Sequence, residues 1–564
     1  MSGKNSHTGS SDWPERSIGL LAICIIMAML LPLYMHAGRN HLIEPQPSRF
    51  LVIEPANIPD LTPGDTISLL AGRYLQILIR HVHGNSEAPI VIRNLGGQAI
   101  ISNTSNYGLA FHHCTHVKLM GNGSQEHEYG ILIAATQGNG ISFDHQSSNL
   151  ELTRVEVANT GLSGVMVKTD PRCDDPDTTR ESFTMYDIHI HNNLIRNTGN
   201  EGLYIGSSYF HPGMQMTCNG KDTIMLPHEI QGVRVYKNLL HHTGRNAIQV
   251  SSATMACMIA DNLVMEDSQR ALAYHMNGIQ VGGGSRCNVY NNQIIDGKGT
   301  GIHYFGMGPA MIYNNLIVNP GRSHYPDLPA SEYPVHGVFV KHIFSETTNP
   351  IHLFHNTIVN PRTDGIRYEN QYAHDSRIQN NLLVNPGAFA QIKNEAFIRI
   401  HEACRQLVVS HNYLSLNPAD VYFTAPMMMD FSLLPHSPVI NKGIDLQTFG
   451  IDTDIAGLTR PFGQTSDIGA YEYQGISQTD SPSGAGLYVF PNPADTEINL
   501  LISFQTDETV TINFYDVTGK RVFSTQRERF CAHDLFPVAH LSQGMYLVRV
   551  QSSAHQASGI FIKK

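Results

Sequence analysis

Between Tyr236 and Gly306 one short pattern of residues occurs three times in succession. The copies are YKNLLHHTGRNAIQVSS, ADNLVMEDSQRALAYHMNGIQVGGG and YNNQIIDGKGTGIHYFG. Each holds a turn with an asparagine, an apolar strand, a polar turn and a second strand of the form small–apolar–x–apolar. Repetition at about 20 to 50 residues is typical of solenoids, in which each copy is one coil. We therefore estimate the size of the fold by counting coils, not from chain length.

The turn asparagine recurs on both sides of these copies. Its positions are Asn193, Asn238, Asn262, Asn292, Asn315, Asn356, Asn381 and Asn412. Asparagine tolerates the left-handed backbone that a sharp bend uses, and its amide can bond to the asparagine of the coil above and below. We therefore expect a stacked ladder whose asparagines also carry the left-handed conformation. The two longest intervals hold insertions, at residues 207–229 and 322–335.

The second strand of each coil alternates between apolar inward positions and outward positions. The inward residues include Val165 and Val167, Leu203 and Ile205, Ile248 and Val250, and Ile279 and Val281. We expect them to form continuous aliphatic stacks that are stabilised by contacts between neighbouring coils. The composition agrees with stacked strands and tight turns, because only 15% of residues are charged and 48 are glycine. The formal net charge of −11 argues against a nucleic-acid partner, which needs a basic surface.

Two further segments resemble known families. LTPGDTISLLAGRY at residues 61–74, followed by EAPIVIRNLGGQAIIS at 87–102, resembles the opening coils of right-handed parallel β-helix proteins of the polysaccharide-lyase type, including chondroitinase B-like enzymes. SPVINKGIDLQTFGIDTDIAGLTRPFGQTSDIGAYEY at 437–473 resembles the segment that closes many exported β-helix proteins. The resemblance implies an all-β fold: a right-handed parallel β-helix of about twelve coils over 61–435, closed by residues 436–473. Within the closing segment Asp452, Asp454 and Asp467 could clamp loops or bind Ca²⁺.

The two ends of the chain point to export. Residues 1–37 hold Lys4, Arg16 and an apolar run from Ile18 to Met35, which indicates a signal peptide, although the run is also long enough for an uncleaved anchor. Residues 38–60 are a polar spacer and 474–486 a Gly/Ser/Pro linker to a C-terminal β-sandwich. LYVFPNPADTEINL, INFYDVTGKRV, LSQGMYLVRV and GIFIKK within 487–564 resemble the type A sorting domain of the type IX secretion system. That resemblance implies passage across an outer membrane by the type IX machinery, removal of the domain, and a protein that is secreted or attached to the cell surface.

Seven of the eight cysteines lie in the exported part, so at least one stays unpaired within the chain. Cys257 and Cys287 each precede the turn asparagine of their coil by the same interval and should stack on neighbouring rungs. Parallel strands lie about 4.8 Å apart, which a disulfide tolerates. Cys173 and Cys218, both in insertions, are a second candidate pair. The alternative interpretation is that these cysteines are small buried apolar residues.

The outward side chains should form one long face. The first outward column reads Ala110, Ser142, Met166, Tyr204, Gln249, Gln280, His303, Phe339 and Arg367, and the second includes His112, Asp144, Lys168, Gly206, Ser251, Gly282, Phe305, Lys341 and Glu369. Rings, amides and glycines suit a sugar chain that lies flat. We therefore predict substrate-binding roles for Glu201, Tyr204, Asn246, Gln249, His275, Asn277, Gln280, Phe305 and His336. A polar outer face without a ligand is the alternative.

A lyase that acts on a uronic acid needs a cation, a base and an acid. Lys168, Arg245, His303 and Lys341 are our candidate catalytic residues, and Glu201 could support a base or a Ca²⁺ ion. A glycoside hydrolase needs two nearby carboxylates, and no convincing pair is seen. No catalytic residue of the resembled lyases transfers by motif, because the paired acids of those enzymes are missing here.

Metal ligands are harder to identify. The acidic run at Asp174, Asp175 and Asp177 could bind Ca²⁺ or could be a solvated loop. Histidine pairs such as His112 and His113 lack the spacing of a zinc site.

These observations leave two classes of function open. We expect a monomer that binds an extracellular polysaccharide along the Glu201–Lys341 face, with β-elimination as the candidate reaction. The alternative is a non-catalytic surface adhesin or a carbohydrate-binding or structural rod.

Overall fold

The computed structural model describes residues 38–474 and 485–563, apart from 104, 323–334, 343–348, 390–394, 427–428, 491–493, 495, 503–508, 517–518, 529–533 and 554–555. The expected signal peptide and most of the second insertion and of the linker therefore lie outside the described residues. The chain divides between Tyr473 and Gln474 into two compact units. No helix in the described ranges has the length and apolar character needed to cross a membrane.

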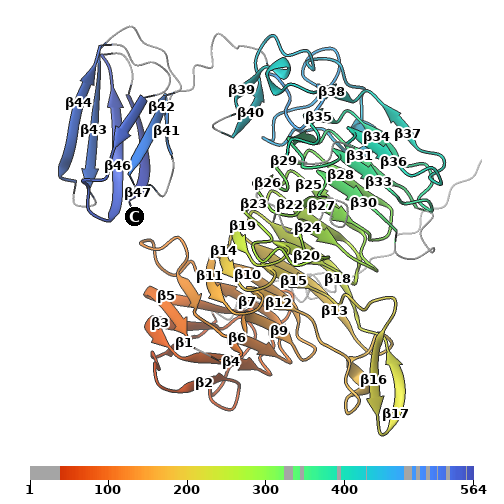
Figure 1. Cartoon of the computed structure of the whole chain (residues 1–564). Coiled ribbons are helices and arrows are strands. Elements are labelled where there is room, and N and C mark those ends of the chain that lie inside the picture. The colour runs from red at the N-terminus through yellow and green to blue at the C-terminus, as the bar shows by residue number, and fades with distance from the viewer. Residues whose placement is uncertain are drawn as a thin grey trace, which may run out of the picture. The chain divides into compact units, whose positions relative to one another are not determined.

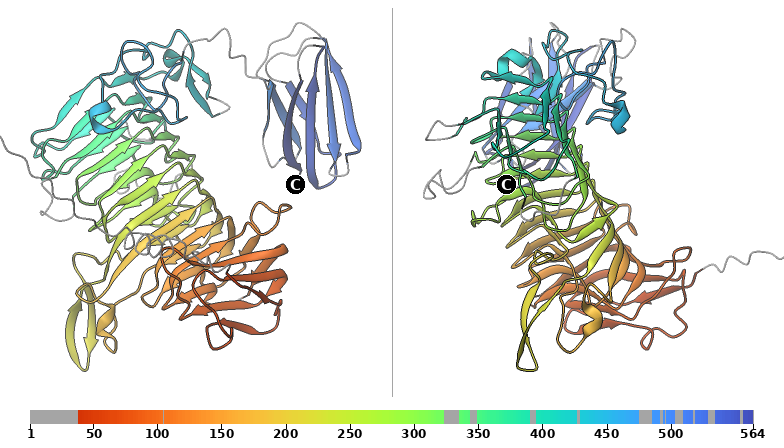
Figure 2. Two further views of the ribbon diagram at one scale, coloured as in Figure 1. Left: turned by 180° about the vertical axis from the view of Figure 1, so that it is seen from behind. Right: turned by 90° about the vertical axis from the view of Figure 1, so that its right-hand side faces the viewer.

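The first unit is a stack of coils, seen from three sides in Figures 1 and 2. One side of the stack is a twelve-stranded sheet in which every neighbouring pair is parallel. Its strands are β2 (Phe50–Ile53), β4 (Gln76–Arg80), β6 (Tyr107–His112), β9 (Asn139–Asp144), β12 (Val165–Val167), β15 (Leu203–Ile205), β20 (Ile248–Val250), β24 (Asn277–Val281), β27 (Thr300–Tyr304), β30 (Val338–Val340), β33 (Ile366–Tyr368) and β36 (Ile398–Ile400). Twelve rungs agree with the count expected from the sequence. The first of them, β2, lies within residues 38–60, however, so part of the segment that we predicted to be a polar spacer is the first rung of the sheet.

Two further parallel stacks close each coil. They begin from β1 (Asn40–Ile43), β3 (Thr66–Tyr74) and the long strand β5 (Ile90–Ser102), which pairs with the first strand of both stacks. One stack holds β7 (Thr115–Met120), β10 (Ser148–Thr153), β13 (Thr184–His191), β18 (Glu229–Tyr236), β21 (Ala253–Met255), β22 (Cys257–Ala260), β25 (Cys287–Tyr290), β28 (Ala310–Tyr313), β31 (Ile351–Phe354), β34 (Arg377–Gln379) and β37 (Val408–Ser410). The other holds β8 (Ile131–Ala134), β11 (Val155–Thr160), β14 (Leu194–Thr198), β19 (Leu239–Thr243), β23 (Leu263–Met265), β26 (Gln293–Ile295), β29 (Leu316–Val318), β32 (Thr357–Val359), β35 (Leu382–Val384) and β38 (Tyr413–Ser415). The unit is thus a parallel β-helix, as the repeat predicts.

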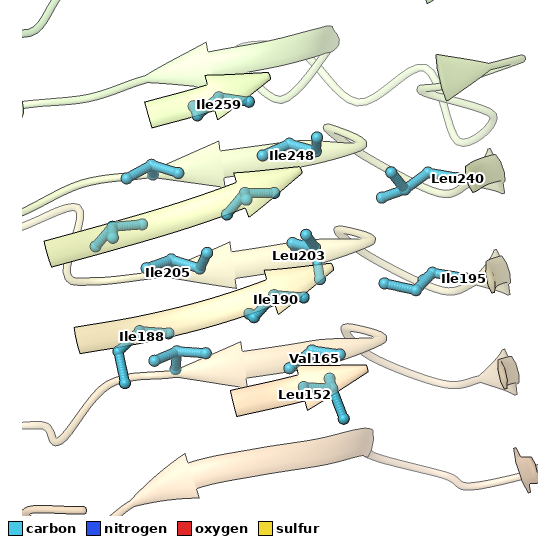
Figure 3. Close-up of a cluster of buried hydrophobic side chains, with 14 of the residues drawn as sticks. Leu152, Val165, Ile188, Ile190, Ile195, Leu203, Ile205, Leu240, Ile248 and Ile259 are labelled. Carbon is cyan, nitrogen blue, oxygen red and sulfur yellow. The ribbon is translucent and has the colours of Figure 1, made fainter. Parts of the chain in front are cut away.

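The interior of the coils is filled by aliphatic side chains in register. Val165 pairs with Leu203, Leu203 with Ile248 and Ile248 with Ile279, and all four are fully buried. Figure 3 shows the first three on successive rungs. The inward positions predicted from the sequence are therefore confirmed, and each coil is stabilised by burial against its neighbours.

The asparagine ladder is also present, with one correction. Each ladder residue from Asn193 to Asn381 donates a hydrogen bond from Nδ2 to Oδ1 of the next, over 2.9–3.0 Å. The left-handed conformation, however, belongs to the residue before each ladder asparagine, such as Asp261 (φ 55°) before Asn262 and Asn291 (φ 54°) before Asn292. Our assignment of that conformation to the ladder asparagines is wrong. The side-chain amide of each ladder asparagine is buried and points along the stack. The left-handed backbone of the turn is therefore adopted by the residue that precedes the asparagine in the sequence.

The first insertion forms a hairpin of β16 (Met214–Cys218) and β17 (Lys221–Met225), which projects from the coils in Figure 1. A disulfide joins Cys218 to Cys173, which lies close before the short 3-10 helix η1 (Pro176–Thr178). A second disulfide joins Cys257 and Cys287 on neighbouring rungs. Both candidate pairings are confirmed.

The closing segment follows η2 (Pro418–Val421), β39 (Phe423–Ala425) and β40 (Asp430–Leu433), and contains η4 (Gln447–Phe449). Its apolar residues pack on the outer side of the last coils, where Val439 and Ile468 join one cluster with Leu316 and Leu382. It thus runs along the flank of several coils. Asp454 and Asp467 accept backbone hydrogen bonds within the segment, which is the loop-clamping role that we considered.

The second unit is a small β-sandwich built around a core that includes Ile512, Phe514, Val548 and Phe561. Its strand order is β44 (Arg521–Arg527), β43 (Val510–Asp516), β46 (Gly544–Gln551), β47 (Gln556–Lys563), β41 (Ala485–Phe490), β42 (Glu497–Ile502) and β45 (Asp534–Pro537). All neighbours are antiparallel except β41 and β47.

Candidate functional site

The outer face of the twelve-stranded sheet carries the side chains that the sequence singles out. The register aligns them rung by rung in the order Tyr204, Gln249, Gln280, His303, Phe339, Arg367 and Arg399. A small residue and two apolar inward positions on each strand fix this alignment, because side chains alternate between the two faces of a strand. The face is one continuous column, but its members fall into separate groups.

The amides in the middle of the column are bonded to one another. Asn246 donates to Oε1 of Gln249 over 2.8 Å, and Asn277 donates to Oε1 of Gln280 over 2.9 Å and to Oδ1 of Asn246 over 2.9 Å. Gln249 also donates to the hydroxyl of Ser208, at the start of the first insertion, over 2.9 Å. All four amides are buried. Their first role is therefore to satisfy each other, and sugar hydroxyls would have to compete with these bonds.

Glu201, Arg245 and His275 form a second group beside the amides. Oε1 of Glu201 lies 3.6 Å from Nη1 of Arg245 and 3.9 Å from Nδ1 of His275, and Oε2 accepts a 3.1 Å hydrogen bond from Ser163. Glu201 is almost fully buried. The structure thus brings together three of the predicted residues, with the carboxylate already held by a cation and a hydroxyl.

Lys168 and Tyr204 make a third group. Nζ of Lys168 lies 2.8 Å from Oδ2 of Asp170 and 5.2 Å from the centre of the Tyr204 ring. The Tyr204 hydroxyl is 3.1 Å from that of Ser208. Lys168 is therefore already paired, and it lies four rungs from His303 along the strand order.

A pocket of about 300 Å³ opens on the same face around His303. Its lining residues are Tyr274, Met276, Asn277, Thr300, His303, Val335, Phe339, Lys341, Arg367 and Glu369. The His303 ring stacks on Phe339, with centroids 4.8 Å apart and planes 7° apart, and meets Phe305 edge-on at 4.9 Å. Two predicted catalytic residues, His303 and Lys341, therefore share one pocket with aromatic walls.

A network of charges around the buried Asp364 adjoins this pocket through Arg367. Asp364 lies 2.9 Å from Nε of Arg399, 3.7 Å from Nη1 of Arg367 and 3.5 Å from Nδ1 of the buried His336. Arg367 is held in turn by Glu369, whose carboxylate is 2.6 Å away. The Arg367 guanidinium is thereby held near Phe339, 5.9 Å from the centre of its ring.

His303 is held in its neutral form. Burial, together with the positive charge of Lys341, lowers the pKa of His303 to about 3. Its Nε2 is shielded from solvent and has no hydrogen-bond partner. Burial also lowers the pKa of His336 well below its usual value, with Arg367 adding to the effect. The pocket therefore presents the uncharged imidazole of His303 beside the side chains of Lys341 and Arg367.

This electrostatic arrangement predicts a loss of stability in acid. His303 is neutral in the fold but takes up a proton near pH 6.5 in the unfolded chain, so its contribution is complete above about pH 6.5 and declines as pH falls towards 3. Urea titrations should show that the free energy of unfolding falls between about pH 8 and pH 4.5. In His303→Gln this dependence of stability on pH should be smaller. The control is His401→Gln, a substitution at an exposed histidine. If stability depended on pH equally in wild type and His303→Gln, His303 would not be held neutral in the fold.

Several pocket residues were not among our predicted site residues. Arg367, Phe339 and Glu369 were already in the outward columns that we predicted, but we assigned them no binding or catalytic role. Arg399, which adjoins the pocket, sits on a strand preceded by Phe397, where the rungs from β6 to β33 have glycine or alanine. Tyr274 lies in a turn with a left-handed backbone (φ 64°). Among the Ca²⁺ candidates, Asp174 pairs with Arg172 over 2.7 Å, and no metal-ligand group in the described ranges includes these acids.

Comparisons with known proteins agree with both units. Residues 139–317 match the family described as "Right handed beta helix region", and 488–564 match "Secretion system C-terminal sorting domain". None of the curated proteins matches the chain in sequence. The first unit is therefore a right-handed parallel β-helix, and the C-terminal type IX sorting domain shows that the protein is exported through the machinery that reads this domain.

Similarity to solved structures is low. A GH136 lacto-N-biosidase from Eubacterium ramulus shares 11% identity over 67% of this chain and 68% of its own, with a TM-score of 0.46. An alginate lyase from a Paenibacillus species shares 16% identity over 64% of this chain and 99% of its own, with a TM-score of 0.33. Pectate lyase Pel9A shares 14% identity over 76% of this chain and 97% of its own, with a TM-score of 0.36.

Proposed function

We propose that the protein binds an acidic extracellular polysaccharide on the outer face of the twelve-stranded sheet, with the pocket around His303 as its centre. The observation that carries the proposal is the combination of Lys341 and Arg367 with the Phe339 ring in one pocket. A sugar ring stacks on an aromatic face, and a uronate carboxylate is held by ammonium and guanidinium groups. Because the protein is exported, such a polymer is within its reach.

Each charged side chain has a separate part in this proposal. Lys341 is exposed and supplies a mobile point charge, whereas Arg367 is fixed by Glu369 and presents its charge in one place. The exposed Tyr274 also lines the pocket and offers a second ring. The neutral His303 adds no charge, so binding should respond to salt through Lys341 and Arg367.

Binding to uronic-acid polymers and to neutral glucans tests the proposal directly. We expect the wild-type chain to bind acidic polymers, with affinity that falls as salt rises, and to bind neutral glucans weakly. Lys341→Ala should weaken binding about tenfold or more, a change of about 1.4 kcal/mol. The matched control is Lys221→Ala, which removes a lysine of the β16–β17 hairpin. Equal binding by wild type and Lys341→Ala would refute the pocket.

Tyr204→Ala tests how far the polymer extends. Tyr204 is three rungs from His303, about 14 Å at the usual strand spacing. If a chain of several sugars lies along the face, Tyr204→Ala and His303→Ala should each weaken binding of long polymers. Loss in His303→Ala alone would restrict the site to the pocket.

Cleavage by β-elimination is the second candidate, and one observation favours it. A neutral imidazole without a hydrogen-bond partner can accept the C5 proton of a uronate, while Lys341 neutralises the carboxylate. The C4–oxygen bond then breaks, a C4–C5 double bond forms, and the leaving oxygen takes the proton. The shielding of His303 Nε2 from solvent opposes this role, because a covering group must first move.

The absorbance of the unsaturated product distinguishes the two candidates. With a lyase, product should form from at least one uronic-acid polymer and fall about 100-fold or more in His303→Gln, with binding retained. Binding without product from any polymer would identify a non-catalytic adhesin. His127→Ala is the control, since this histidine lies outside the sheet.

A further inference from the structure

A group of potential metal ligands lies on the same sheet, far from the His303 pocket. His112 is the last residue of β6 and pairs with Asp144, the last residue of β9, and His145 follows. One ligand atom from each of these three residues lies within 4.8 Å of the other two. β9 is five strands from β27, about 24 Å at the usual strand spacing, so the group is separate from the proposed polysaccharide pocket.

The backbone turns His145 back towards the neighbouring rung. His145 has a left-handed conformation, φ 47°, and its amide donates a 2.6 Å hydrogen bond to Oδ1 of Asp144. Its ring therefore lies over that of His112, with centroids 3.8 Å apart. Oδ2 of Asp144 is 3.5 Å from Nδ1 of His145, and this nitrogen is shielded from solvent without a hydrogen-bond partner. An unused imidazole nitrogen and a carboxylate oxygen thus lie side by side.

From this geometry we propose that His112, Asp144 and His145 bind a divalent transition-metal ion, for which Zn²⁺ is the natural probe. Two imidazoles and one carboxylate are the ligand set that suits zinc and its neighbours, whereas Ca²⁺ takes oxygen ligands. In a tetrahedral zinc site the ligand atoms are about 3.3 Å apart, so rotation of the two imidazoles must bring them closer. Water can complete the coordination, because all three residues are only partly buried.

The surroundings permit a positive ion at this position. Arg80 and Lys168 occupy the rungs on either side, but Arg80 pairs with Glu54 and Lys168 with Asp170. Both flanking cations are therefore neutralised by their own carboxylates.

Neighbouring histidines pack against His145. His113 meets His145 edge-on at 5.8 Å and stacks on His81 at 5.1 Å. The backbone amide of His113 also donates to the carbonyl of His145 over 2.9 Å. These contacts hold His145 next to His113 on the neighbouring rung.

Zinc titration of the full chain, produced without a histidine tag, tests the site. We expect one zinc ion per chain by calorimetry and by metal analysis after dialysis. His112→Ala, Asp144→Asn and His145→Ala should each weaken binding at least tenfold, and Ca²⁺ should not compete. Replacing zinc with Co²⁺ should give the visible absorption of a site with mixed nitrogen and oxygen ligands.

The double variant His241→Ala/His242→Ala is the matched control. It removes two adjacent histidines near a carboxylate, but His242 meets Glu266 through Nε2 while its Nδ1 faces His241, so these atoms do not converge. Circular dichroism verifies that each variant is folded. The absence of zinc from wild type, or equal affinity in folded triad variants, would overturn the proposal. Unchanged polysaccharide binding by zinc-free protein would show that the two sites are independent.

Discussion

Replacing Arg460 with alanine is expected to lower the free energy of unfolding of the β-helix unit by about 3–5 kcal/mol. Arg460 is fully buried, and its Nε lies 3.0 Å from Oε2 of Glu472. Its Nη1 donates to Oδ1 of Asn314, on the flank of the coils, over 3.1 Å. Removal of the guanidinium leaves Glu472 buried without its cation and breaks a bond between closing segment and coils. The cost is large because the remaining charge has no access to water.

The acidity of Glu472 makes this prediction specific. Burial raises the pKa of Glu472 to about 7 even though Arg460 opposes the shift. In Arg460→Ala the Glu472 carboxyl can take up a proton and so avoid being a buried charge without a partner. The loss of unfolding free energy relative to wild type should therefore be smaller at about pH 5.5 than at about pH 8. Urea unfolding at both pH values measures the difference. Arg405→Ala, an exposed arginine near the end of the coils, is the control. A deficit below about 1 kcal/mol at pH 8 would show that the closing segment contributes little stability.

The coils could be predicted because the same alternation of inward apolar and outward residues recurs in every copy of the repeat. Ile248 and Val250, or Ile279 and Val281, alternate with outward residues in the same way on every copy, so one register satisfies all of them. The same regularity aligned Gln249, Gln280 and His303 on the outer face. Period and alternation are local properties of the sequence, and they determined the architecture and the sheet on which the proposed sites lie.

Features that depend on contacts between coils were not predictable in this way. The outward Gln249 and Gln280 look like free sugar-binding amides in the sequence, yet they are bonded to Asn246 and Asn277. His112, Asp144 and His145 lack the spacing of a metal motif because a left-handed residue and a step between rungs bring them together. Such convergence appears only when neighbouring coils are placed in space.

The ladder asparagines give the second large effect. Nδ2 of Asn292 donates to the carbonyls of Ile259 and Tyr290, over 2.9 Å each, and to Oδ1 of Asn315 over 3.0 Å. Its Oδ1 accepts from the amide nitrogen and from Nδ2 of Asn262, over 3.1 and 2.9 Å. A buried polar group left without its partner costs about 1–3 kcal/mol. Since Asn292→Ala removes several partners at once, we expect a loss of about 3–5 kcal/mol.

The neighbouring Asn291 supplies the decisive comparison, because it and not Asn292 has the left-handed backbone. Glycine adopts that conformation without strain, so Asn291→Gly should change stability by a few tenths of a kcal/mol. Asn292→Gly should be as damaging as Asn292→Ala, because the lost amide and not the backbone accounts for the cost. Urea unfolding of the three variants tests this. If Asn292→Gly were tolerated and Asn291→Gly were not, the asparagines would be retained for the bend, and the ladder of hydrogen bonds would add little to the stability of the coils.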